Sequence, residues 1–206
     1  MFIRGLTLIA SAAIALAQAP AQVRDSTLGA GTAGYSPITA GERFNWVVQT
    51  TVGPANLAAG FLVSGWQTWS NEPREYGPHW EGFGKRYGLR LAEGATGTAM
   101  EATLGSLWRE DPRYFRTSGQ SFKRRLGHAA KMTFMATDRN GNAMPAYARY
   151  VAIPGNSFLA NTWRPDSQTR TSDAFERIPY SFLTHFLGNT FTEFWPDIRQ
   201  RVFRKK

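Results

Sequence analysis

The sequence predicts an all-α protein, a single helical bundle of about five helices. Three observations lead to this fold class. Apolar residues recur at helical spacing over several long stretches, and sustained period-two alternation, which strands would show, is missing. Glycine and alanine also recur every three or four positions in one stretch, which favours close helix packing. With 206 residues, 42% of them hydrophobic and 14% aromatic, the chain is large enough for one core and too apolar for a disordered protein.

The first 21 residues have the features of a secretory signal peptide. Arg4 provides the positive charge, Leu6–Leu16 forms an apolar run, and Ala19-Pro20-Ala21 is an A-x-A-like cleavage site. The alternative is an uncleaved anchor, although the run is short for a hydrocarbon core of about 30 Å. Residues 22–40 are rich in Gly, Ser, Thr and Ala and predict a flexible lead-in. The helical domain is then expected over residues 41–206.

The first expected helix covers Thr39–Asn71. Thr39 and Glu42 have the spacing of a capping box. The segment Phe44–Asn71 is 28 residues long and carries no charge, but several polar residues and Pro54 interrupt it. We therefore expect a mostly buried helix with a kink at Pro54. A helix embedded in a membrane, or lying on its surface, is the alternative.

The second expected helix covers Trp80–Arg109. It ends before Pro112, since the residue that precedes a proline avoids the α conformation. Its small residues are expected to form the packing stripe, and they are Gly84, Gly88, Ala92, Ala95, Ala99 and Ala102.

A third, amphipathic helix with a basic start is expected over Ser121–Thr137. The segment Asp138–Asn142 then predicts a turn. Asn140-Gly141 could instead close a β-hairpin, but the alanine-rich flanks favour helix.

The last two helices are expected in the C-terminal third of the chain. Met144–Trp163 is the fourth helical stretch and Ala174–Trp195 the fifth. A terminal helix can restart at Pro196 and end in the basic run Arg199–Lys206.

The charge and the lack of cysteine limit the function classes. Lys and Arg number 24 against 15 Asp and Glu, which gives a formal net charge of +9. In an exported protein this charge favours an anionic lipid or envelope polymer surface as the partner rather than nucleic acid. The alternative is that it provides solubility alone. The absence of cysteine excludes a disulfide scaffold, a thiol nucleophile and a zinc ribbon.

No catalytic residue, metal site or cofactor is predicted. His79, His128 and His185 lack metal-ligand spacing, and no phosphate loop or nucleophile motif occurs. Glu93 and Glu101 are eight residues apart and lie roughly on one helix face. They indicate ion pairs of the bundle or, alternatively, the acid and base of an exported hydrolase. Two inward-facing carboxylates without paired arginines would favour the hydrolase.

Two stretches combine arginine with aromatic residues. Residues 108–116 (WREDPRYFR) serve either a structural purpose or an anion cradle. Residues 192–206 (TEFWPDIRQRVFRKK) have the apolar stripe and the cations of an interfacial helix, with a docked C-terminal helix as the alternative. The candidate anion- or lipid-contacting residues are Arg109, Arg113, Arg116, Trp195, Arg199, Arg201, Phe203, Arg204, Lys205 and Lys206.

Three motifs together resemble an exported bacterial family of uncharacterised function. They are EGFGKRYG (81–88), DPRYFR (111–116) and EFWPDI (193–198), and the resemblance spans roughly residues 40–206. The first motif departs from the family pattern because Phe83-Gly84 stands where the family has Tyr-Gly. The resemblance implies export and a shared fold, and it supplies no catalytic residue.

The expected function is that of an exported, envelope-associated protein without enzymatic activity, which contacts a membrane or lipid. Its expected location is periplasmic or outer-membrane-associated. The alternatives are an exported hydrolase that uses the helix carboxylates and a small outer-membrane β-barrel.

Overall fold

The structure, a computed structural model, describes residues 35–117 and 119–203. The predicted signal peptide (1–21), most of the lead-in and residues 204–206 lie outside them. The described residues form one helical bundle, so the predicted all-α fold is confirmed. Its helices are α2 (Ala40–Val52), α3 (Pro54–Trp69), α4 (Trp80–Trp108), α5 (Phe122–Phe134), α6 (Tyr147–Leu159) and α7 (Thr171–Phe203). The short elements are η1 (Arg74–Tyr76), η2 (Ala160–Thr162), η3 (Asp166–Gln168), β1 (Met135–Thr137) and β2 (Ala143–Pro145).

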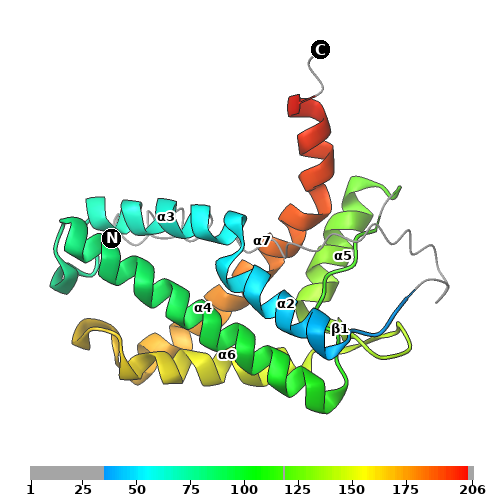
Figure 1. The fold of residues 1–206 in the computed structure, drawn as a ribbon, viewed down its shortest axis with the longest axis horizontal. Coiled ribbons are helices and arrows are strands. Elements are labelled where there is room, and N and C mark those ends of the chain that lie inside the picture. Colours follow the sequence, from blue (N-terminus) through cyan, green and yellow to red (C-terminus); the bar gives the residue numbers. More distant parts are fainter. Residues whose placement is uncertain (1–34, 118, 204–206) are drawn as a thin grey trace.

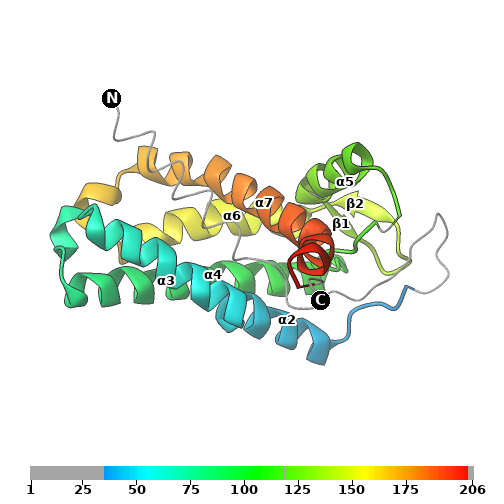
Figure 2. The ribbon, with the colours of Figure 1, turned by 90° about the horizontal axis from the view of Figure 1, so that it is seen from above.

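Helix α4 is the centre of the bundle. It packs against α2, α3 and α6, and α7 packs against α5 and α6 (Figures 1 and 2). The C-terminal end of α7 projects beyond the rest of the body, beside the start of α5 (Figure 1).

The uncharged N-terminal segment forms two helices instead of one kinked helix. The predicted capping box is confirmed: the Thr39 hydroxyl accepts from the Glu42 backbone N–H, and the Glu42 carboxylate accepts from the Thr39 backbone N–H. The chain is extended at Gly53, and Pro54 starts α3, where its missing N–H leaves no helical hydrogen bond unmade.

The prediction that this segment is mostly buried is wrong for one face. Trp46 and Val63 are buried, but other large apolar side chains are more than half exposed: Phe44, Phe61, Leu62 and Trp69. In the part of the chain that the structure describes, every helix is too short or too polar to cross a bilayer.

Residues 135–145 form a β-hairpin, which corrects the predicted extension of the third helix to Thr137. β1 and β2 pair antiparallel, with Met135 opposite Pro145 and Thr137 opposite Ala143. The Asp138 carboxylate accepts from the backbone N–H groups of Asn140 and Asn142, and Gly141 has a φ of 85°. This turn chemistry outweighs the helical preference of the alanine-rich flanks.

Helix α7 is one helix of 33 residues, which runs through Pro179 and Pro196. The predicted restart at Pro196 is therefore not a separate helix. Packing on α5 and α6 keeps the chain helical on both sides of each proline.

Close packing through glycine does occur on α4, but not along the whole predicted stripe. A Cβ at Gly97 would press on Asn156 of α6, and one at Gly105 would contact Ala148 of α6. Gly84 and Gly88 are exposed, with open space beside them. The contact face of α4 is therefore rotated relative to the predicted one.

The interior is rich in alanine and in polar groups. Of the fourteen buried hydrophobic residues of the described chain, nine are alanine. Buried polar or charged residues are at least as numerous and include Arg86, Glu101, Arg149 and Glu193. Much of the large apolar surface therefore lies outside the core.

Candidate functional site

Glu93 and Glu101 line one cavity of about 280 Å³, which lies between α2, α4, α6 and α7. We call it the inner cavity. The eight-residue spacing predicted from the sequence does place both carboxylates on the same side of α4.

Each of these glutamates is paired with an arginine. Two nitrogens of Arg164 lie 2.5 Å from the two carboxylate oxygens of Glu93. Two nitrogens of the buried Arg149 lie 3.0 Å from a Glu101 oxygen. A carboxylate held by a guanidinium is a poor general acid or nucleophile, whereas a hydrolase would need carboxylates without such partners. The arrangement thus favours the ion-pair interpretation.

His185 of α7 completes this wall of the cavity. Its Nε2 lies 3.8 Å from Glu101, and 28% of its side chain is exposed. Burial, together with the positive charge of Arg149, lowers the pKa of His185 to about 4, against the opposing effect of Glu101. The imidazole is therefore neutral at pH 7.

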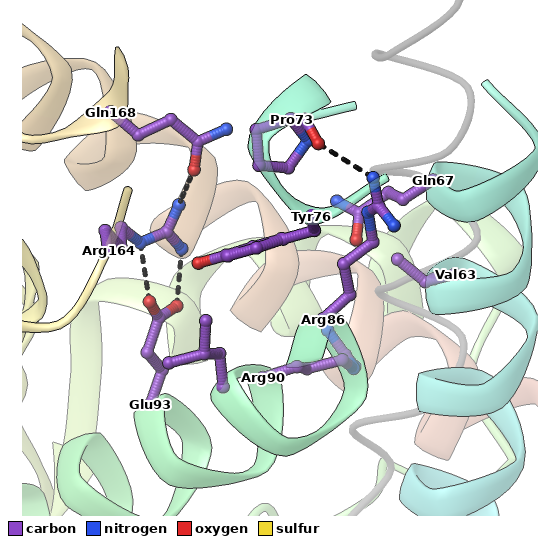
Figure 3. A pocket seen from close by; sticks show the side chains of 10 residues that line it. Val63, Gln67, Pro73, Tyr76, Arg86, Arg90, Glu93, Arg164 and Gln168 are labelled. Atoms are coloured by element: carbon purple, nitrogen blue, oxygen red, sulfur yellow. Dashed lines mark hydrogen bonds and ion pairs between the residues drawn. The ribbon is translucent and has the colours of Figure 1, made fainter. Parts of the chain in front are cut away.

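A second cavity of about 160 Å³ adjoins the first, and Arg90, Glu93 and Arg164 line both. Figure 3 shows the Tyr76 ring between Arg86 on one side and the Glu93–Arg164 pair on the other. Arg86 is buried, and it holds the neighbouring loop by donating to the carbonyl oxygens of Glu72, Pro73 and Gly77. The first family-like motif, which contains Arg86, therefore secures this loop.

The arginines of residues 108–116 do not form an anion-binding cradle on the surface. Arg113 is buried and donates to both oxygens of Asp111 and to the Ser36 carbonyl. Arg116 is buried and donates to the Glu193 carbonyl. Arg109 is exposed and ends α4 in a left-handed conformation. The three candidates are thus not gathered on one face, and two of them hold chain segments together.

The second and third motifs meet at Glu193, which is fully buried. Its carboxylate accepts from the Tyr114 hydroxyl at 2.9 Å, from the Thr117 backbone N–H and from Arg125 of α5 at 2.9 Å. Burial and the Glu193 charge raise the pKa of Tyr114. We call this network the Glu193 junction, and it joins the C-terminal end of α7 to the body.

Beyond the junction, the start of α5 and the end of α7 form a surface that we call the tip. Phe122 contacts Phe194 with ring centroids 4.9 Å apart, and the Arg125 guanidinium lies 4.4 Å from the Phe194 ring centroid. The exposed residues of the tip are Phe122, Lys123, Arg124, Trp195, Ile198, Arg199 and Arg201.

Four of the residues predicted to contact anions or lipid belong to this end of α7. They are Trp195, Arg199, Arg201 and Phe203, the last residue of the helix. Arg204, Lys205 and Lys206 lie outside the described residues. Sequence analysis missed Phe122, Lys123 and Arg124 as site residues, although the basic start of their helix was the signal that could have indicated them.

Comparison with known proteins did not assign the chain to a family. A scan against protein-family models, a search of curated proteins and a search of solved structures found no match to the chain. Among the described residues, no group of three His, Asp or Glu side chains is placed to hold a metal ion. The function must therefore be inferred from the arrangement of the residues themselves.

Proposed function

We propose that this protein is an exported, envelope-associated protein that binds an anionic membrane surface through the tip and performs no catalysis. The observation that carries the proposal is the exposure of aromatic and aliphatic side chains next to cations at the projecting end of α7 (Figure 1).

The composition of the tip fits a bilayer interface. Trp195 and Ile198 are exposed by 38% and 44%, and Phe122 by 64%. The exposed cations beside them are Lys123, Arg124, Arg199 and Arg201. Apolar side chains of this kind insert at the level of the headgroups, and each cation near an anionic surface contributes about 1 kcal/mol. Four cations thus supply about 4 kcal/mol of attraction that depends on lipid charge and salt.

The position of Lys123 and Arg124 supports an anionic partner. Both lie in the first turn of α5, which contains no acidic residue and no side-chain cap from Ser121. A positive charge at a helix N-terminus opposes the helix dipole. The charges of these two side chains therefore gain nothing from the helix dipole, and an anionic surface would compensate them.

The uncharged, exposed face of α3 is a different case. Phe61, Leu62 and Trp69 are exposed there, but no cation accompanies them on that helix. Without charge complementarity, that face does not identify an occupant, so the proposal depends on the tip alone.

Vesicle binding tests the proposal. The purified protein should sediment with vesicles that contain phosphatidylglycerol and not with pure phosphatidylcholine, and added salt should weaken binding. Deletion of Ile198–Lys206 keeps Glu193 and Asp197 and should abolish sedimentation. The double variant Arg199→Glu/Arg201→Glu should weaken partitioning at least about 30-fold, since it removes two attractions of about 1 kcal/mol each and adds two repulsive charges.

The matched control is Arg139→Glu/Arg170→Glu. It changes the net charge by the same amount at exposed positions in the hairpin turn and before α7. Equal loss of binding in both double variants would mean that net charge, and not the tip, drives association. Unchanged binding after the deletion would refute the proposal.

Cell fractionation tests the localisation. The full chain should be processed near Ala21 and recovered with envelope membranes, from which a high-salt wash should release it. Recovery of the unprocessed chain in the cytoplasm would contradict export.

A further inference from the structure

We infer that the inner cavity binds a small organic anion, a carboxylate or a phosphate monoester that bears hydroxyl groups. This site is separate from the tip, and it does not depend on membrane binding.

The first observation is a set of buried polar atoms that have no hydrogen-bond partner in the described structure. Five of them belong to residues that line the inner cavity. They are Trp46 Nε1, Thr50 Oγ1, Asn56 Oδ1, Arg90 Nε and Arg177 Nε. Trp46 and Asn56 are only 6% and 8% exposed. Because buried donors and acceptors in folded proteins are almost always paired, these atoms point to an occupant of the cavity.

The second observation is an excess of positive charge. Glu93 is neutralised by Arg164 and Glu101 by Arg149. Within the described chain, Arg90 and Arg177 make no ion pair with a carboxylate. Arg177 is held by neutral acceptors instead: the carbonyl oxygens of Ser157 and Gln168 and the Asn161 side chain.

The neighbouring carboxylates offset these two cations only in part: Glu93 acts on both, and Asp173 acts on Arg177. His185 is neutral at pH 7, since burial and the charge of Arg149 hold its pKa at about 4. Partial burial nevertheless lowers the pKa of both Arg90 and Arg177, because removal from water disfavours the charged form. A guanidinium stays charged nonetheless, so an anion is the ligand that would relieve the unfavourable burial.

The size and walls of the cavity define the ligand class. The volume of about 280 Å³ lies just below the usual range of about 300–1,000 Å³ for small-molecule sites, which suits a ligand of metabolite size. Tyr180, which is 44% exposed, marks where the cavity meets solvent. A hydroxylated anion would use both the arginines and the hydroxyl groups of the wall. These hydroxyl groups belong to Thr50, Thr98, Ser157, Tyr180, Ser181 and Thr184.

Arg90 provides a sharp test because, among the described residues, it has no hydrogen bond to lose. Glycerol 3-phosphate, inorganic phosphate and citrate, at matched ionic strength, serve as probes in thermal-shift and calorimetric titrations of the full chain. At least one probe should raise the melting temperature saturably. Arg90→Gln should leave the melting temperature of the ligand-free protein unchanged or higher, and should weaken that probe's Kd at least tenfold. The exposed-site control Arg139→Gln should keep the wild-type Kd.

A second measurement keeps the inference testable if Arg90→Gln is poorly folded. The indole N–H signal of Trp46, assigned in the NMR spectrum with Trp46→Phe, should shift on addition of the binding probe. A shift with soluble probes identifies a free anion as the ligand, and a shift with phosphatidylglycerol vesicles alone identifies a lipid headgroup. Absence of a shift with all of them, or equal binding to wild type and Arg90→Gln, overturns the inference and leaves water as the occupant of the cavity.

Discussion

The inner cavity and the tip combine the same residue types, arginine beside aromatic rings, in opposite environments. In the cavity, Arg90 and Arg177 are half-buried and make no ion pair with a carboxylate of the described residues. At the tip, Arg199 and Arg201 are exposed to solvent on the last turns of α7. We expect half-buried guanidinium groups without a carboxylate partner to select a small anion, and exposed ones to be attracted to an extended anionic surface. If both proposals hold, the net charge of this chain has two separate uses.

A third environment for arginine is the buried ion pair. Arg113, Arg125 and Arg149 are paired with buried carboxylates and hold segments of the chain together. If the cavity, the tip and the Glu193 junction act independently, variants in each region should affect different properties of the protein.

The largest effect is expected for Glu193→Ala. The substitution removes the buried carboxylate that accepts from Arg125 and from the Tyr114 hydroxyl, although Arg125 keeps Asp197 as a partner. Removal of one partner from a buried ion pair typically destabilises by about 3–5 kcal/mol. Urea denaturation should show this loss. Glu176→Ala, at an exposed position of the same helix, should change the free energy of unfolding by less than about 0.5 kcal/mol. Similar stability of both variants would show that the junction does not hold the tip.

Gly82→Ala should have the next largest effect on the free energy of unfolding. Gly82 packs against the loop beside the second cavity. A Cβ at this position would overlap the backbone carbonyl oxygens of Tyr76 and Gly77, in the loop that Arg86 secures. We expect a loss of about 1–3 kcal/mol, as for an overpacked site. Gly84→Ala, two residues further along α4 and in open space, should instead stabilise by up to about 1 kcal/mol through helix propensity. The two variants should therefore shift the urea midpoint in opposite directions.

A smaller effect is expected from the pH dependence of His185, which faces Glu101 and Arg149. Its pKa is about 4 in the folded protein and about 6.5 when unfolded, so only the unfolded chain takes up this proton between those values. Stability from this group should fall as the pH falls from about 6.5 to 4. Because 28% of the side chain is exposed, we expect about 1 kcal/mol rather than the full linkage value.

The comparison of wild type with His185→Gln isolates this contribution. Other groups titrate as well, since burial raises the pKa of Glu110 and acts in the opposite direction. The unfolding free energy of the wild type minus that of His185→Gln should therefore be larger at pH 7 than at pH 4.5. A difference that does not vary with pH would mean that His185 titrates normally.

The smallest effect is expected for Ile198→Gln at the tip. Ile198 is 44% exposed, so its replacement should change the free energy of unfolding by less than about 0.5 kcal/mol while it weakens vesicle binding. Ile153, an 8% exposed residue of the cavity wall, provides the contrast: Ile153→Ala should destabilise by about 2–5 kcal/mol. Equal destabilisation by the two variants would contradict the conclusion that the exposed side chains of the tip contribute little to folding stability.

Local chemistry made the helices predictable. Thr39 and Glu42 cap α2 as their spacing requires, and Pro54 begins a new helix because it cannot continue the old one. The hairpin was less predictable, because its alanine-rich flanks favour helix while Asp138 and Gly141 favour a turn. Pro196 predicts a helix boundary, but α7 continues through it because it packs on α5 and α6.

The partners across the fold were not predictable in the same way. Glu93 meets Arg164 and Tyr114 meets Glu193 over separations of 71 and 79 residues. Periodicity records which face of a helix is apolar, and it contains no information on which charged residue will lie opposite. The positions of the cavity arginines and of Phe122 at the tip depend on the tertiary arrangement alone.

The alanine-rich, polar interior has a thermodynamic consequence. Unfolding of this protein would expose little large aliphatic side chain and many hydrogen-bonded polar groups. Since apolar exposure raises the heat capacity and polar exposure lowers it, the heat-capacity change on unfolding should fall below the usual value of about 12–15 cal/mol/K per residue. The curve of stability against temperature should then be flatter than for a protein of this size with an aliphatic core. Calorimetry at several pH values would measure this directly, as the slope of unfolding enthalpy against melting temperature.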